Sequence, residues 1–331
     1  MTDYWQSRPV LVTGAGGFIA SHLIEALVSG GAHVRAFVRY NSRSDPGLLS
    51  SLPPEVTARV ETIAGDLRDP DGVRRAVGDA THVFHLGALI SIPYSYRHPT
   101  DVVESNILGT LHILQAVRDT DVVRLVHTSS SEVYGTALKV PIDEAHPLQG
   151  QSPYSASKIG ADALAESFHR AYGVPVATLR PFNTYGPRQS GRAVIPAIIS
   201  QALTQETIHL GNLEARRDLT YVSDTVSGFL RLAESEGVEG EVFNLGTGED
   251  IRIGDLADLI VELTGRQAEI RVDPDRLRPE KSEVQRLVSD NRAARARLGW
   301  TPRVSLKDGL KKTIRWVEKN LDFYQSDRYQ I

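Results

Sequence analysis

The sequence predicts an α/β protein with a doubly wound parallel sheet and a smaller, interleaved C-terminal lobe. Two patterns support this class. Short runs rich in β-branched residues alternate with helical patterns through the first half of the chain, and strands separated by helices of this length are joined by right-handed crossovers into a parallel sheet. Several strand candidates, such as VLV and VFHL, are almost continuously apolar, which is typical of a sheet covered on both faces.

The individual elements follow from local patterns along the chain. β-rich runs predict strands at 9–14, 33–39, 59–66, 81–89, 122–129, 175–183 and 241–248. Helical periodicity predicts helices at 18–31, 104–118 and 153–172.

After about residue 185 the alternation of strands and helices becomes less regular, and Pro and Arg become more frequent. The segment 241–248 is nevertheless typical of a last core strand, and no sharp linker separates the two halves. We therefore expect two interleaved units. The larger domain comprises residues 1–185 with about 216–248, and the smaller lobe comprises about 186–215 and 249–331.

The composition excludes several classes of protein. The chain has 331 residues, is 41% hydrophobic and has a formal net charge of −4, so it has no global electrostatic signature for a nucleic acid partner. It contains no cysteine, which excludes disulfides and thiolate metal sites, and its histidines form no metal-binding pattern. No stretch approaches the roughly 18 apolar residues of a membrane helix. We expect a cytoplasmic protein without a membrane partner.

A glycine loop follows the first predicted strand and opens the first predicted helix, with the spacing Gly14-x-x-Gly17-x-x-Ala20. Glycines allow a tight turn and close backbone approach, and the helix N-terminus offers N–H groups and a positive dipole to a pyrophosphate. A glycine pattern alone is weak, but the strand–turn–helix context favours a Rossmann-type dinucleotide site over a plain turn.

The end of the second predicted strand bears on the cofactor. An NAD site usually has Asp or Glu there, whereas this chain has Arg39, Ser42 and Arg43 and no carboxylate between them. These side chains could hold a 2′-phosphate and so favour NADP+, without excluding NAD+; they could equally be solvated loop residues. Asp66, after the third strand, is a candidate for the adenine end of the site or for a helix N-cap.

Tyr154 and Lys158 are four residues apart at the start of the predicted helix 153–172, where Ser152 suits the N-cap and Pro153 the first helical position. We expect the ammonium and an oxidised nicotinamide to lower the pKa of the phenol, which makes Tyr154 a usable base. A YxxxK spacing alone is common on surfaces. Combined with the glycine loop and the serine-rich segment HTSSSEVYG, it favours a catalytic pair.

These motifs together resemble the extended short-chain dehydrogenase/reductase family. They are TGAGGFIASHL, AGDLRD, NILGTL, SSSEVYG, PYSASK, RPFNTYGPR and RRDLTYVSD. Within the family the chain is most similar to nucleotide-sugar 4,6-dehydratases, including the N-acetylglucosamine 4,6-dehydratases of legionaminic-acid-type pathways. The resemblance implies tightly bound NAD(P)+, a nucleoside-diphosphate sugar as substrate, and a 4-keto-6-deoxy sugar as product.

The resemblance also implies roles for individual residues. Tyr154 would take the proton of the sugar 4-OH, with the Ser130 hydroxyl beside it, and Glu132 would remove the C5 proton. Many deoxyhexose dehydratases have Asp where this chain has Ser131, and that Asp protonates the departing hydroxyl. The Ser131-Glu132 pair of this chain instead resembles the arrangement of GDP-mannose dehydratases, so Glu132 would also protonate the departing C6 hydroxyl.

The remaining predicted contacts come from the same resemblance. Those to the nucleotide sugar are Asn183, Arg188, Arg217, Arg278 and Glu283, because bidentate guanidinium groups suit a diphosphate. Those to the cofactor, beside the residues above, are Phe18, Ile19, Leu67 and Leu86.

Other functions stay open at this stage. UDP-glucuronate decarboxylases also carry Ser-Glu at 131–132, a sugar 4-epimerase of the family generally lacks the glutamate, and a dinucleotide-binding protein without activity would have no use for Tyr154 and Lys158. The resemblance further implies a homodimer formed through the helices 104–118 and 153–172.

Overall fold

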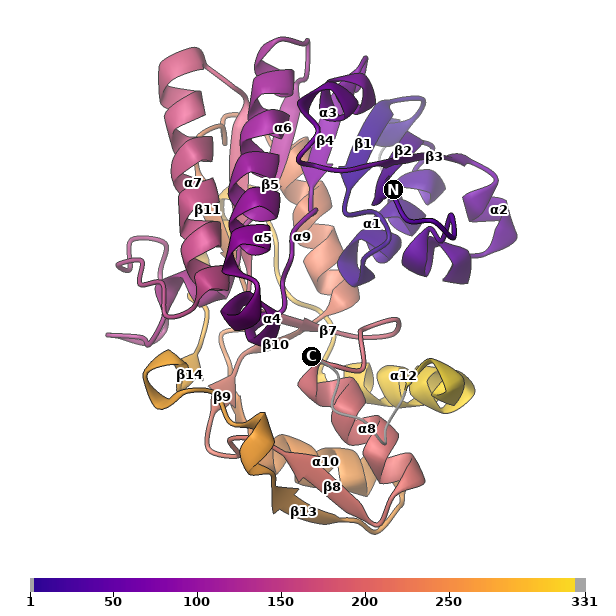
Figure 1. The fold of residues 1–331 in the computed structure, drawn as a ribbon, viewed down its shortest axis with the longest axis vertical. Helices are drawn as coiled ribbons and strands as arrows, with labels where there is room; N and C mark the ends of the chain where they lie inside the picture. Colours follow the sequence, from indigo (N-terminus) through magenta and orange to yellow (C-terminus); the bar gives the residue numbers. More distant parts are fainter. Residues whose placement is uncertain (1–2, 325–331) are drawn as a thin grey trace.

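The structure is a computed structural model that describes residues 3–324 (Figure 1). Its centre is a sheet of seven parallel strands in the order β11-β6-β5-β4-β1-β2-β3. The strands are β1 (Pro9–Thr13), β2 (His33–Arg39), β3 (Val60–Gly65), β4 (His82–His85), β5 (Arg124–Thr128), β6 (Val176–Pro181) and β11 (Val242–Leu245). The predicted class, α/β with a doubly wound parallel sheet, is confirmed.

Helices cover both faces of this sheet. Side chains of β1 alternate between the faces, so that Val10 and Val12 pack with α1 (Phe18–Ser29) and α9 (Val222–Glu234). Leu11 points to the other face, which is covered by three helices. These are α3 (Pro70–Val77), α6 (Gly109–Arg118) and α7 (Pro153–Tyr172). Two buried apolar layers therefore enclose the sheet, which explains the almost continuously apolar strands.

Two predicted elements differ from those observed. The helix expected at 104–118 is a π-helical segment, Glu104–Leu108, followed by α6, and it is preceded by α4 (Ile92–Arg97) and α5 (Pro99–Val103). The strand expected at 81–89 already ends at His85. Asn106, inside the π-helical segment, accepts a hydrogen bond from Leu89 N and donates one to Leu89 O. This side chain therefore holds the segment after β4 in a shape that does not continue the sheet.

Elements beyond one end of the sheet form small additional sheets (Figure 1). β7 (Asn183–Tyr185) pairs with β10 (Leu219–Tyr221), β8 (Thr207–Leu210) with β13 (Glu269–Val272), and β9 (Arg216–Arg217) with both β12 (Ile251–Arg252) and β14 (Arg286–Leu287). The other helices are α2 (Pro54–Thr57), α8 (Val194–Thr204), α10 (Ile253–Thr264), α11 (Arg292–Leu298) and α12 (Leu306–Lys319). The division of these residues into a substrate lobe stays a prediction.

The carboxyl ends of β1, β4, β5 and β6 lie next to one another because these strands are parallel neighbours. In open parallel sheets this edge, where the strand order reverses, is the place where ligands bind. Within residues 3–324, no helix has the length and apolarity needed to cross a membrane.

Candidate active site

The glycine loop between β1 and α1 is shaped by close backbone contacts. Gly14 has a φ of +64°, and a Cβ there would lie 2.7 Å from the backbone nitrogen of Gly87, after β4. Gly17 caps α1 without a side-chain hydrogen bond, and a Cβ on it would meet Gly14 O at 3.0 Å. The first residues of α1, Phe18 and Ile19, follow directly. Side chains are thus absent where a pyrophosphate would approach the helix N-terminus, and the loop fits a dinucleotide.

Asp66 and Arg39 lie on adjacent strand ends, because Arg39 pairs with Gly65 in the register of β2 and β3. Asp66 does not cap a helix, since Asp69 is the N-cap of α3. Its carboxylate instead accepts hydrogen bonds from Arg68 Nε at 3.0 Å and Arg68 Nη2 at 2.8 Å. The bonds from Arg68 lower the pKa of Asp66, and the charge of Arg39 lowers it further.

The loop after β2 is ordered by its own polar groups. The side-chain oxygen of Asn41 accepts hydrogen bonds from the backbone N–H groups of Arg43 and Asp45, and Leu48 N donates to Gly16 O at 3.0 Å. Ser42 and Arg43 are exposed. On the other side of the glycine loop, Leu67 lies against Gly87 and Gly109, and Leu86 packs against the core.

Tyr154 and Lys158 project from the first turns of α7. Ser152 and Ser155 form a reciprocal capping box, with Pro153 in the first turn, as the sequence predicts. Both side chains are buried. Lys158 Nζ donates to Thr128 O, the last carbonyl of β5, at 2.5 Å. The helix start is therefore fixed against the carboxyl end of the sheet.

Burial is the largest influence on the pKa values of this pair. Burial raises the pKa of Tyr154 to about 12; a hydrogen bond with Ser130 lowers it, and Glu132 and Asp162 raise it further. Burial lowers the pKa of Lys158 to about 8, opposed by the charge of Asp162. Burial therefore outweighs the hydrogen bond with Ser130 and raises the pKa of the phenol, and a pKa lowered by the ammonium together with an oxidised nicotinamide stays a prediction.

A buried anchor, which the sequence analysis did not identify, lies one turn after Lys158. The Asp162 carboxylate accepts hydrogen bonds from His127 Nε2 at 3.0 Å, Ser129 Oγ at 2.7 Å and Arg180 Nε at 3.1 Å and Nη2 at 2.9 Å. Arg180 also donates to Tyr134 OH at 2.9 Å. These hydrogen bonds join α7 to β5 and β6 one turn after Lys158; we call this group the Asp162 anchor. Two features of the sequence could have predicted these contacts. They are the i, i+4 spacing from Lys158 to Asp162 and the presence of Arg180 within an apolar strand.

Glu132 lies in a 3₁₀ turn, η4 (Ser131–Tyr134), that follows β5. Ser130 is its N-cap, and its hydroxyl accepts a hydrogen bond from Glu132 N at 3.2 Å. Ser131 is buried. Since Ser130 is also a hydrogen-bonding neighbour of the Tyr154 phenol, the structure brings Ser130, Glu132 and Tyr154 together.

Two arginines and two glutamates from distant segments meet above this turn; we call Glu132, Arg217, Arg278 and Glu283 the Arg–Glu cluster. Arg217 Nη2 lies 3.4 Å from Glu283 Oε1. Arg278 Nη1 lies 3.8 Å from Glu132 Oε1 and 4.0 Å from Glu283 Oε1. Burial lowers the pKa of Arg217, with a further contribution from Arg278. Two guanidinium groups beside the same Glu283 carboxylate favour an anionic ligand.

Two predicted substrate residues have different surroundings. Asn183 begins β7, and its buried side-chain oxygen has no hydrogen-bond partner among the described residues. Arg188 does not join the Arg–Glu cluster. Its Nη2 donates to Glu25 Oε2 at 2.7 Å and to His22 Nδ1 at 2.6 Å, both on α1, and its backbone has a φ of +69°. The left-handed backbone and the ion pair direct Arg188 towards α1.

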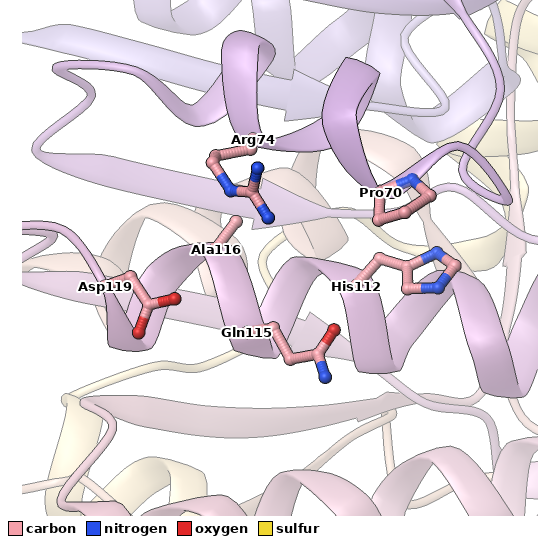
Figure 2. A pocket seen from close by; sticks show the side chains of 6 residues that line it. All are labelled: Pro70, Arg74, His112, Gln115, Ala116 and Asp119. Atoms are coloured by element: carbon pink, nitrogen blue, oxygen red, sulfur yellow. The ribbon is translucent and has the colours of Figure 1, made fainter.

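A small hollow between α3 and α6 lies elsewhere (Figure 2). It is lined by Pro70, Arg74, His112, Gln115, Ala116 and Asp119. Arg74 forms an ion pair with Asp71 at 2.9 Å, and His112 donates to Leu67 O at 2.8 Å. Because none of the predicted site residues lines it, the hollow is not part of this site.

A glycine loop between β1 and α1, a buried Tyr–Lys pair and an adjacent serine at the carboxyl edge of a parallel sheet are typical of a short-chain dehydrogenase/reductase. The chain belongs to the GDP-mannose 4,6-dehydratase family of these enzymes, whose family model matches residues 11–313.

Similar proteins in this family have two kinds of activity. The chain is 34% identical over 310 residues to the UDP-glucose 4-epimerase of Mycolicibacterium smegmatis, covering 92% of this chain and 96% of that protein. It is 32% identical over 321 residues to the dTDP-glucose 4,6-dehydratase of Streptomyces antibioticus, covering 96% and 94%. The solved dTDP-glucose 4,6-dehydratase of Streptomyces venezuelae, with NAD bound, matches with a TM-score of 0.85 at 29% identity, covering 97% of this chain and 100% of that one. The family is thus one of nucleotide-sugar dehydratases and epimerases.

Proposed function

We propose that this protein is a nucleotide-sugar 4,6-dehydratase that converts a nucleoside-diphosphate hexose or N-acetylhexosamine to its 4-keto-6-deoxy product. The observation that carries the proposal is the position of Glu132. Its carboxylate is close enough to Tyr154 to raise the pKa of the phenol, and it also faces Arg278 of the Arg–Glu cluster. Oxidation of the sugar at C4 by Tyr154 and the cofactor does not need a second base. Elimination of water does need one, and Glu132 lies between Tyr154 and the Arg–Glu cluster, where the sugar is proposed to bind.

The proposed chemistry assigns each proton to a residue of this chain. Tyr154, hydrogen-bonded to Ser130, takes the proton of the sugar 4-OH, and the nearby Lys158 ammonium stabilises the phenolate. NAD(P)+ supplies the hydride acceptor at C4 and, once reduced, the hydride donor at C6. Glu132 removes the C5 proton that the 4-ketone has acidified and gives it to the C6 hydroxyl, which leaves as water. When the hydride returns to C6, C5 takes up one proton through Glu132, which balances the 4-OH proton that Tyr154 accepted. Ser131 has no ionisable side chain, so one carboxylate serves both steps.

The Arg–Glu cluster and Asn183 are proposed to hold the nucleotide. Arg217 and Arg278 bind the diphosphate, the Asn183 side chain supplies a further polar contact, and Glu283 accepts a hydrogen bond from the nucleotide ribose. At the cofactor's adenosine end, exposed Arg39, Ser42 and Arg43 favour NADP+ over NAD+, since no carboxylate of β2 faces the ribose. The protein is further proposed to act as a homodimer through α6 and α7, which the mass in solution would test.

A product assay tests the proposal directly. Purified protein is incubated with GDP-, UDP- and dTDP-hexoses and UDP-N-acetylglucosamine, and the products are analysed by mass spectrometry. Loss of one water without net consumption of added cofactor supports the dehydratase. An unchanged mass with an inverted C4 supports the epimerase activity of the M. smegmatis relative, and release of CO₂ from UDP-glucuronate supports a decarboxylase. If no sugar loses water, the dehydratase proposal is wrong.

A further inference from the structure

Arg278 lies between two carboxylates without a hydrogen bond to either. Its Nη1 is 3.8 Å from Glu132 and 4.0 Å from Glu283, both longer than a hydrogen bond. This nitrogen is buried and finds no hydrogen-bond acceptor within residues 3–324. A guanidinium held by charge alone, with a buried N–H directed at no acceptor, is available to an incoming oxyanion.

Glu132 likewise has a charged group without a hydrogen bond among the described residues. Its backbone is fixed, because Glu132 N donates to the Ser130 hydroxyl at 3.2 Å and Gly135 N donates to Glu132 O at 3.3 Å. Its carboxylate, in contrast, accepts no hydrogen bond in the described part of the chain, and its only ion pair there is the long one with Arg278. Its side chain is 14% exposed, so the two arginines of the Arg–Glu cluster, rather than bulk water, dominate its surroundings.

Arg278 therefore faces the proposed base, and both guanidinium groups are proposed to face the diphosphate. The charge of Glu132 is the largest favourable charge on buried Arg217, ahead of Glu283. A diphosphate carries more negative charge than one carboxylate and matches guanidinium groups in a bidentate manner. A bound diphosphate would therefore replace the Glu132 carboxylate as the main negative charge beside the two guanidinium groups.

We propose that Glu132 and the nucleoside diphosphate compete for Arg278 and Arg217, so that binding of the nucleotide releases the Glu132 carboxylate to act on the sugar. This inference rests on the proposed function and deepens it. The Glu132 carboxylate is paired with the arginines of the Arg–Glu cluster until a nucleotide occupies the cluster, and it then becomes available as a base. Recognition of the diphosphate and activation of the base are then a single electrostatic event.

The competition is measurable without sugar chemistry. UDP, GDP and dTDP are titrated calorimetrically into the wild-type protein and into the Glu132→Gln variant. Removing the competing carboxylate should tighten binding of the preferred nucleotide by about tenfold, within the range of coupling between close charge pairs at binding sites. The matched control is Glu280→Gln, which removes an exposed carboxylate from the Arg278 segment and should leave the affinity unchanged.

A double-mutant cycle assigns the effect to Arg278. In an Arg278→Gln background, Glu132→Gln should tighten binding by much less than in the wild-type background. Equal affinity of wild type and Glu132→Gln, or an undiminished gain in the Arg278→Gln background, would overturn the competition while leaving the dehydratase assignment intact. Failure of every nucleoside diphosphate to bind the wild-type protein would overturn both.

Discussion

The Asp162 anchor and the Arg–Glu cluster each combine carboxylates with arginines, yet their geometries are opposite. Around Asp162 four donors reach one carboxylate at 2.7–3.1 Å. In the Arg–Glu cluster the corresponding separations are 3.4–4.0 Å, and Arg278 Nη1 has no acceptor among the described residues. A buried carboxylate whose charge is fully hydrogen-bonded makes a rigid support, whereas an arginine nitrogen without an acceptor, such as Arg278 Nη1, is suited to bind a ligand.

The largest effect is expected from Glu132→Gln, which removes the proposed base from the Arg–Glu cluster but keeps its shape. Water loss should fall by about 10² to 10⁴-fold, because proton transfer from C5 loses its acceptor. The sugar should still reduce the bound cofactor, because Tyr154 is unchanged. The absorbance of the reduced cofactor measures this step. Dehydration at a rate near that of wild type would show that Glu132 has another role.

Asp162→Asn should be the most destabilising change in the comparison. It leaves Arg180 buried without its counter-charge, at a cost of about 3–5 kcal/mol. Urea unfolding followed by circular dichroism would measure this loss. The exposed pair of Asp255 with Arg252 provides the control, since Asp255→Asn should not change the unfolding midpoint.

The same variant separates support from binding. Under conditions where Asp162→Asn remains folded, kcat should fall because β5 and α7 are no longer held together, while nucleoside diphosphate affinity at the Arg–Glu cluster should be unchanged. If Asp162→Asn were as stable as the wild-type protein, the proposed difference between the Asp162 anchor as a support and the Arg–Glu cluster as a binding site would be wrong.

Lys158 makes the stability depend on pH. Burial lowers the pKa of Lys158 in the folded protein to about 8, from 10.5. Between these values the unfolded chain binds one more proton than the folded protein at this residue, so stability rises with pH through this window, by up to about 3 kcal/mol. In Lys158→Met this rise should be absent. Parallel stability–pH curves for the two proteins, measured by urea unfolding, would contradict the shift.

The smallest effect is expected for nucleotide binding by single arginine variants. Arg217→Gln should weaken nucleoside diphosphate binding by about 10- to 100-fold, because each lost charged hydrogen bond is worth about 1.5–3 kcal/mol. Arg188→Gln is the informative control. Its guanidinium is paired with Glu25 on α1, so calorimetry should show nearly wild-type affinity. A comparable loss in Arg188→Gln would return this residue to the substrate site.

The amino-acid sequence determined the features that depend on local spacing. Strand–helix alternation predicts the parallel sheet, Gly14 and Gly17 predict the turn into α1, and the four-residue spacing places Tyr154 and Lys158 on one helix face. These features follow from backbone periodicity and glycine conformation, which act over a few residues.

Only the tertiary structure decided which distant charges meet. Asp162 finds His127 and Arg180 on two different strands. Glu132 meets Arg278 across 146 positions of chain. Arg188 was predicted to bind the diphosphate together with Arg217 and Arg278, yet its backbone directs its side chain to α1. A side chain's residue type fixes what it can bind, but its partner and the degree of burial, which set its charge state and its free energy, depend on how the chain brings separate segments together.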